Sequence, residues 1–104
     1  MIARKWHGRV PTEKAEAYHK YLLKTGLKEY ASVTGNRGVF LLTRKEGDIT
    51  HIDTLTFWDD ISAIKRFAGE DYEKAKYYPE DKDFLFEFEL NVTHYDVWES
   101  LPGF

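Results

Sequence analysis

Cysteine is absent from this 104-residue sequence, which excludes a disulfide scaffold, a thiolate zinc site and a thiol enzyme. A surplus of positive charge is absent as well. The 15 lysines and arginines stand against 18 aspartates and glutamates, for a net charge of −3. Nucleic-acid binders usually carry a strong basic excess, so we expect no nucleic-acid partner.

Long apolar runs are also missing. The longest, residues 39–42, is far shorter than the ~20 residues of a membrane helix, so no membrane partner is expected. The first seven residues lack the apolar stretch that is typical of a signal peptide. We therefore expect a cytoplasmic protein, and the length is typical of a single domain that spans residues 1–104.

Aromatic residues, by contrast, are abundant. They make up 16% of the sequence, as 7 phenylalanines, 7 tyrosines and 3 tryptophans. A small core can hold some of these rings, but their number suggests a second use in an oligomer interface, a ligand pocket, or both.

Residue patterns in the first half predict three strands and a helix. Alternation over residues 2–10 predicts a strand, one face of which carries Ile2, Arg4, Trp6, Gly8 and Val10. Thr12 is expected to cap a helix over residues 13–30, which Gly26 weakens. Residues 39–44 and 49–58 predict two more strands joined by a turn at residues 45–48.

The second half predicts helices and a last strand. Asp59 or Asp60 is expected to cap a helix that ends at Gly69. We expect a short helix over residues 70–78, a solvated charged patch over 80–83 and a strand over 91–99. The order βαββαβ predicts a ferredoxin-like α+β fold, an antiparallel sheet with helices on one face. Apolar side chains on both faces of residues 39–42 predict that a second copy covers the other face.

Three stretches carry a family resemblance. They are Arg4-x-Trp6-x-Gly8, the segment Thr56–Asp60, and Ile64–Gly69 followed by Ala75-Lys76-Tyr77. Together they resemble the antibiotic-biosynthesis-monooxygenase-like (ABM) domains of the dimeric α+β barrel superfamily. The resemblance implies a homodimer whose two sheets close into an α+β barrel, with a pocket between sheet and helices in each subunit. Characterised members include cofactor-independent monooxygenases acting on polycyclic phenols and haem-degrading enzymes, and many members have no established activity.

The haem-degrading branch of this family uses an asparagine, a tryptophan and a histidine. Trp58, at the end of the third strand, matches the tryptophan. The first strand offers Arg4 and Trp6 in place of the asparagine, and Tyr77 stands where the histidine is expected. The resemblance therefore disfavours haem binding or haem degradation.

Arg4, His94 and Trp58 are the candidate catalytic residues. Arg4 could bind a phenolate or carboxylate, or form a structural salt bridge with Asp53 or Asp96. His94 is the candidate general base, and the alternative is a histidine satisfied by structural hydrogen bonds. Trp58 could stack on a flat substrate, or simply pack a helix against the sheet.

A second group of residues is expected to bind substrate, and consists of Trp6, Tyr18, Leu22, His51 and Tyr77. The alternative for the rings is ordinary core packing. His7 could approach His51 or His94, because the first strand of this fold lies between the third and the fourth. No short-range metal-binding signature supports a metal site there, and no cofactor is expected.

The combined expectation is a cofactor-independent monooxygenase acting on a small aromatic molecule, phenolic or quinone-like. The first alternative is a non-catalytic dimer that binds a small molecule, and the second is a haem-binding or haem-degrading protein. The rings are expected to divide into three groups. Phe40, Phe57 and Phe67 belong to the core, Trp6, Trp58 and Tyr77 to the pocket, and Trp98 and Phe104 to the contact with the partner subunit.

Overall fold

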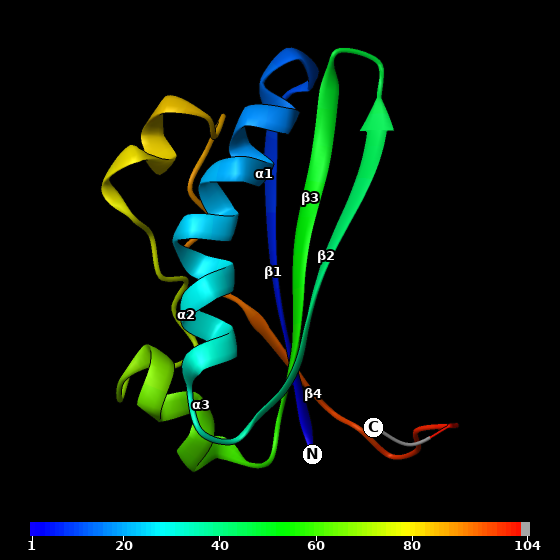
Figure 1. Ribbon diagram of the computed structural model, residues 1–104, viewed down its shortest axis with the longest axis vertical. Coiled ribbons are helices and arrows are strands. Elements are labelled where there is room, and N and C mark those ends of the chain that lie inside the picture. The colour runs from blue at the N-terminus through cyan, green and yellow to red at the C-terminus, as the bar shows by residue number, and fades with distance from the viewer. Residues whose placement is uncertain (103–104) are drawn as a thin grey trace.

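The structure is a computed structural model that describes residues 1–102. Its single sheet contains β1 (Ile2–Pro11), β2 (Asn36–Glu46), β3 (Ile49–Trp58) and β4 (Thr93–Asp96), all antiparallel, in the order β2-β3-β1-β4. Three helices, α1 (Ala15–Lys24), α2 (Gly26–Ser32) and α3 (Ile61–Ala68), lie on one face of it (Figure 1). The predicted ferredoxin-like α+β fold is confirmed. Among residues 1–102, no helix is long and apolar enough to cross a membrane.

The predicted alternation of β1 is confirmed. Arg4, Trp6 and Val10 are buried on the helix-covered face, whereas His7 and Arg9 point to the open face and are half-buried. Arg4 lies opposite Thr56 of β3 and His94 of β4. A charged side chain from the central part of the sheet is thus directed into the interior.

The helix ends follow the sequence in part. The long first helix breaks at Thr25, between α1 and α2 and next to Gly26, which was expected to weaken it. Asp60 caps α3, as expected, by accepting a hydrogen bond from the amide of Ala63 at 2.9 Å. The predicted cap at Thr12 is wrong. Its hydroxyl donates instead to the carbonyl of Gly47 at 3.0 Å, so it ties the helix entry to the β2–β3 turn.

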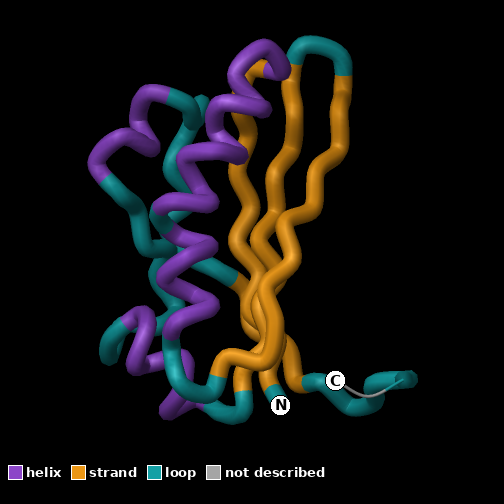
Figure 2. Tube along the Cα trace, in the orientation of Figure 1, coloured by secondary structure: helices purple, strands orange, loops and turns teal. Residues whose placement is uncertain are grey.

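The chain between α3 and β4 differs most from expectation, and Figure 2 draws most of it as loop. The predicted helix over residues 70–78 is absent, because backbone groups there bond to residues 90–92 instead. Residues 80–83 are not a fully solvated patch, since Asp81 is only 3% exposed and belongs to the short 3-10 helix Pro79–Asp83. The last strand, β4, is shorter than the predicted 91–99.

Two clusters of buried side chains fill the space between sheet and helices. One gathers around Trp6, Tyr18 and Leu22, and the other around Tyr30, Trp58, Ile64 and Phe67. The expected core position of Phe67 is therefore confirmed.

The open face of the sheet carries apolar side chains that this chain leaves uncovered. Phe40 and Leu42 are each 46% exposed, so the expected core position of Phe40 is wrong for the single chain. Phe57, which is half-buried, lies beside Phe40 with ring centroids 5.8 Å apart. Trp98 is 94% exposed, and Phe104 lies outside the described residues.

Candidate functional site

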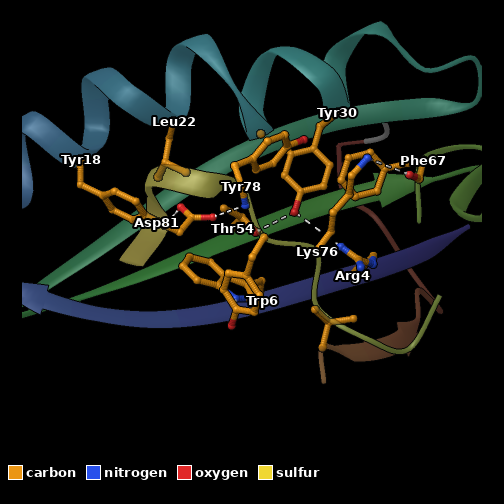
Figure 3. Close-up of a pocket in the computed structure, with 13 residues that line it drawn as sticks. Arg4, Trp6, Tyr18, Leu22, Tyr30, Thr54, Phe67, Lys76, Tyr78 and Asp81 are labelled. Atoms are coloured by element: carbon orange, nitrogen blue, oxygen red, sulfur yellow. Dashed lines mark hydrogen bonds between the residues drawn. The ribbon is translucent and has the colours of Figure 1, made fainter. Parts of the chain in front are cut away.

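A small, partly open cavity lies between the sheet and helices α1 and α2. Its volume is about 30 Å³, which is room for little more than a water molecule. Its wall includes five residues named by the sequence, namely Arg4, Trp6, Tyr18, Leu22 and Tyr77. Figure 3 shows Arg4 toward one end of the cavity and Asp81, beside Tyr18, toward the other.

Arg4 brings a positive charge into this cavity without a matching negative one. Its side chain is 1% exposed and donates hydrogen bonds to the carbonyl of Lys74 at 3.2 Å and the hydroxyl of Tyr30 at 3.5 Å. Its Nε has no hydrogen-bond partner, and no carboxylate within residues 1–102 forms a salt bridge with it. The expected salt bridge with Asp53 is wrong, because Asp53 pairs with Lys5 at 3.8 Å. Burial lowers the pKa of the guanidinium, which shows that the charged form is poorly solvated here.

The aromatic wall of the cavity is held in place by hydrogen bonds. Trp6 Nε1 donates to the hydroxyl of Tyr77 at 3.1 Å, and that hydroxyl donates to the carbonyl of Glu89 at 2.7 Å. The rings of Trp6 and Tyr77 meet edge to face, with centroids 6.2 Å apart. Burial raises the pKa of the Tyr77 hydroxyl, so it stays neutral and can act as donor and acceptor at once.

Asp81 is a cavity residue that the sequence reasoning missed. Its carboxylate accepts hydrogen bonds from the hydroxyl of Tyr18 at 2.9 Å and the amide of Tyr78 at 2.6 Å. Burial raises the pKa of this carboxyl group. The one available signal was the proline at position 79 followed by acidic residues, which is typical of a helix start. No local pattern could indicate that Tyr18 would cover the carboxylate.

Lys76 and Tyr78 close the cavity on the side of α2. Both side chains donate to the carboxylate of Glu29, the tyrosine at 2.5 Å. The ammonium of Lys76 also lies 4.8 Å from the centre of the Phe67 ring. The charge of Lys76 is thus compensated by Glu29, and Arg4 is left as the uncompensated cation of the cavity wall.

Comparison with known proteins gives a structural answer only. No known family's sequence profile matches the chain, and no curated protein matches it. A solved structure of an MhuD variant with two manganese protoporphyrin IX molecules bound per active site matches with a TM-score of 0.66 at 14% identity, covering 99% of this chain and 100% of the other. A putative antibiotic biosynthesis monooxygenase from Bacillus cereus matches with a TM-score of 0.63 at 16% identity, covering 99% and 95%.

SnoaB, a cofactor-independent oxygenase from Streptomyces nogalater, matches with a TM-score of 0.58 at 15% identity, covering 98% of both chains. The chain has the ABM-like fold. At these identities the likeness concerns the fold alone, so the chemistry must be argued from this chain's own residues.

Three of the predicted site residues lie outside the cavity of this ABM-like chain. Trp58 is fully buried in the neighbouring cluster, where its Nε1 donates to the hydroxyl of Thr56 at 2.8 Å. His94 belongs to β4 and lies opposite Arg4 of β1 in the strand register. Its buried Nε2 has no hydrogen-bond partner within residues 1–102. Burial, and then the charge of Arg4, lower the pKa of His94 and so favour the neutral ring. His51 lies on the opposite, open face of the sheet.

On that open face, His51 does meet His7, as the strand order suggested. His7 Nε2 lies 3.0 Å from His51 Nδ1. The outer nitrogen of each ring meets a carboxylate, His7 Nδ1 meeting Glu89 at 2.5 Å and His51 Nε2 meeting Glu46 at 3.1 Å. Within residues 1–102, no three histidine, aspartate or glutamate side chains are arranged to hold a metal ion.

Proposed function

We propose that this protein is a cofactor-independent monooxygenase acting on a small aromatic compound, phenolic or quinone-like. The observation that carries the proposal is the buried guanidinium of Arg4, which has no counter-ion within residues 1–102 and borders a cavity lined by aromatic rings. A buried cation of this kind is costly unless an anion binds to it. The ABM-like fold, shared with an oxygenase that needs no cofactor, supports the same direction.

The chemistry suits an aromatic substrate that becomes an anion. A proton leaves an acidic C–H or O–H group of the substrate, and the resulting anion pairs with Arg4. Dissolved oxygen then reacts with this electron-rich anion. One substrate carbon gains a C=O bond and loses a C–H bond, and the O–O bond breaks. The second oxygen atom leaves as water, which carries this hydrogen and the proton released first.

For the proton acceptor, we favour Asp81 over His94. Asp81 is the one carboxyl group on the cavity wall, and burial holds its pKa above the ordinary value, which suits a base that must return its proton. His94 lies opposite Arg4 in the strand register and does not line the cavity, so in this proposal it does not contact the substrate. Trp6, Tyr18, Leu22 and Tyr77 shape the ring-binding wall, and Trp58 supports them from the adjoining core.

We further propose that the working form is a homodimer in the cytoplasm. Phe40 and Leu42 lie on the open face of the sheet, and their 46% exposure is what a second copy would cover. A sequence without cysteine is compatible with that compartment.

The first alternative is a dimer of the same fold that binds a small molecule without turning it over. The small cavity favours this alternative, because pockets for drug-sized ligands usually enclose about 300–1,000 Å³. Haem binding or degradation is the second alternative, prompted by the porphyrin complex of the MhuD variant. We disfavour it because the cavity wall within residues 1–102 contains no histidine.

Oxygen uptake with a panel of hydroquinones and anthrones tests the proposal. We expect uptake that is lost in Arg4→Met and kept in Arg37→Met, whose arginine pairs with Asp59 at the surface. Ligand binding without uptake would favour the non-catalytic alternative. A Soret shift on haem titration would favour the second alternative, and no response of any kind would overturn the proposal.

A further inference from the structure

Residues 75–90 form a loop whose two ends are held together. The amide of Ala75 donates to the carbonyl of Leu90 at 2.9 Å, and Lys74 and Asn91 form an isolated antiparallel bridge. A loop of this length with adjacent ends is an Ω-loop, a compact surface unit that is frequently functional. In Figure 1 the chain after α3, coloured yellow to orange, rises beside α1 and α2 on the side away from β2 and then turns back toward β4.

This loop supplies part of the cavity wall, namely Lys76, Tyr77, Tyr78 and Asp81. The cavity of about 30 Å³ is too small for an aromatic ring, so a ligand can enter only if part of the wall moves. The sheet and the helices are tied by regular backbone hydrogen bonds, whereas the loop depends mainly on side chains. The loop is therefore the part of the wall that can open.

The loop is attached on two sides. On the helix side Lys76 and Tyr78 bind Glu29, and Leu85 packs into the core. On the sheet side the loop runs along the half of β1 that β4 leaves unpaired, since β4 pairs only with residues 2–5. There the amide of Phe86 donates to the carbonyl of Arg9 at 3.0 Å.

Two side-chain contacts complete the attachment on the sheet side. Arg9 binds Glu87 at 2.7 Å, and His7 binds Glu89 at 2.5 Å. Glu89 makes contacts on both faces of the sheet. Its carboxylate meets His7 on the open face, and its carbonyl accepts a hydrogen bond from the hydroxyl of Tyr77 in the cavity wall. The His7–Glu89 contact thus holds a residue that in turn holds the cavity wall.

The protons available to the two histidines decide how strong this contact is. Ionised carboxylates only accept hydrogen bonds, so His7 Nδ1 and His51 Nε2 must both carry a proton to bind Glu89 and Glu46. The inner nitrogens, 3.0 Å apart, need one further proton between them, since two lone pairs would otherwise face each other. Three protons on two rings make one imidazolium and one neutral imidazole.

A neutral pair has only two ring protons, so one of the three contacts is lost. In every arrangement of the neutral pair, the attraction between an imidazolium and Glu89 is lost as well, and charge-assisted hydrogen bonds are about twice as strong as neutral ones. Glu89 has no other side-chain partner within residues 1–102, whereas Glu46 also binds Arg44 at 3.3 Å. Loss of the shared proton therefore weakens the attachment of the loop.

We propose that the 75–90 loop is a lid over the cavity and that the His7–His51 pair fastens it by holding one shared proton. The lid is fastened while the pair holds that proton and loosens when the proton is lost at higher pH. This inference goes beyond the oxygenase proposal, since it concerns only how the cavity opens and holds whether or not the cavity catalyses a reaction.

The other charged groups around the pair do not account for such a change. They are Lys5 and Arg9 on β1, Asp53 on β3, Arg44 and Glu46 on β2, and Glu87 and Glu89 on the loop. Lysine, arginine and carboxylate side chains ordinarily titrate outside pH 5–8. The hydrogen bond from His51, and then that from Arg44, lower the pKa of Glu46, so its carboxylate stays ionised as the argument requires.

Amide hydrogen exchange of the loop, measured by mass spectrometry at pH 5.5 and 8, tests the proposal. After correction for intrinsic exchange rates, we expect loop protection to fall roughly 3–10-fold between the two values. His7→Gln should remove this pH dependence, because an amide donates at either pH. His19→Gln, at an exposed position on α1, should keep it. Wild-type protection that does not change with pH would overturn the proposal, as would an unchanged dependence in His7→Gln.

A second measurement keeps the proposal testable if His7→Gln does not fold. In wild-type protein, ring-nitrogen chemical shifts should show His7 and His51 releasing one shared proton together, without a matching change at His19. Independent titration of the two rings would contradict the shared proton. Stoichiometric binding of Zn²⁺ with release of that proton would also overturn it, since a metal ion would then be the fastening cation.

Discussion

Arg4 is a residue whose burial is expected to reduce the stability of the fold rather than add to it. Its guanidinium is buried, has lost water, and gains only two neutral hydrogen bonds and a phenylalanine ring 5.4 Å away. Sequence reasoning placed Arg4 on the inward face of β1 correctly. The expected salt bridge could not be tested from the sequence, because it depended on which acidic side chains share that face.

Replacing Arg4 by methionine should separate function from stability. Methionine has a similar volume and no charge, so we expect the free energy of unfolding to stay constant or rise by up to ~2 kcal/mol, while binding of anionic aromatics is lost. Urea unfolding and ligand titration measure the two effects. Ile52→Ala, which removes a core side chain, should instead lower stability by about 2–5 kcal/mol. A comparable loss in Arg4→Met would identify Arg4 as structural.

Asp81 should give stability a distinct dependence on pH. Because burial raises its folded-state pKa above the unfolded value, the protonated carboxyl stabilises the fold below the unfolded pKa of about 3.9. That contribution is lost as the pH rises through the raised value. Urea unfolding from pH 3.5 to 7 should therefore show wild type losing stability relative to Asp81→Asn.

Asp83→Asn, an exposed change in the same turn, is the control for Asp81 and should follow wild type in parallel. Wild type that keeps or gains stability relative to Asp81→Asn as the pH rises would contradict the assignment. From the sequence we expected Asp81 in solvent, because acidic runs usually face water. Its burial depends on a hydrogen bond from Tyr18, which is distant in the sequence.

Among the elements, regular segments were predictable and the loop was not. The alternation of β1, the helix break next to Gly26 and the cap at Asp60 depend on neighbouring residues, so local patterns indicate them. The 75–90 loop depends on bonds between distant residues, such as that from Phe86 to Arg9. The helical propensity of residues 70–78 could not indicate that their backbone groups would form hydrogen bonds with residues 90–92 instead.

Strand β1 has a close contact that a single methyl group should disturb. A Cβ at Gly8 would lie 2.4 Å from the ring of Trp6 and 3.0 Å from Leu85. We expect Gly8→Ala to lower the free energy of unfolding by about 1–3 kcal/mol, because the Trp6 ring and the anchored loop must both shift. Urea unfolding measures it.

Gly26→Ala is the matched change, since a Cβ there finds only ordinary contacts at 3.8 Å and 3.9 Å. It should leave stability unchanged or raise it by up to ~1 kcal/mol, because alanine favours the helix. Equal effects of the two changes would contradict the close packing of Trp6 over Gly8.

At the scale of the whole molecule, the open face of the sheet is the feature that a single chain does not explain. Phe40 and Leu42 are exposed there, and Trp98, which follows β4, is exposed as well. The cavity wall uses another part of the aromatic surplus noted in the sequence, whereas its use in an oligomer interface stays a prediction.

A second copy over this face predicts a species of twice the 12.3 kDa chain mass in light scattering at micromolar concentration. Leu42→Glu should shift it toward the single chain, because a charge would be buried in the contact. Leu23→Glu, at a 53% exposed position on α1, should remain dimeric. A 12.3 kDa species for the wild-type protein would contradict the dimer.

The central claim is that an aromatic anion at Arg4 reacts with oxygen inside this fold without a cofactor. Reaction under ¹⁸O₂, with metal-free protein and an anthrone substrate, tests it most directly by mass spectrometry of the product. We predict one ¹⁸O atom per product molecule with wild type and no product above background with Arg4→Met. An unlabelled product, whose new oxygen atom would come from water, or equal yield with Arg4→Met, would contradict the account.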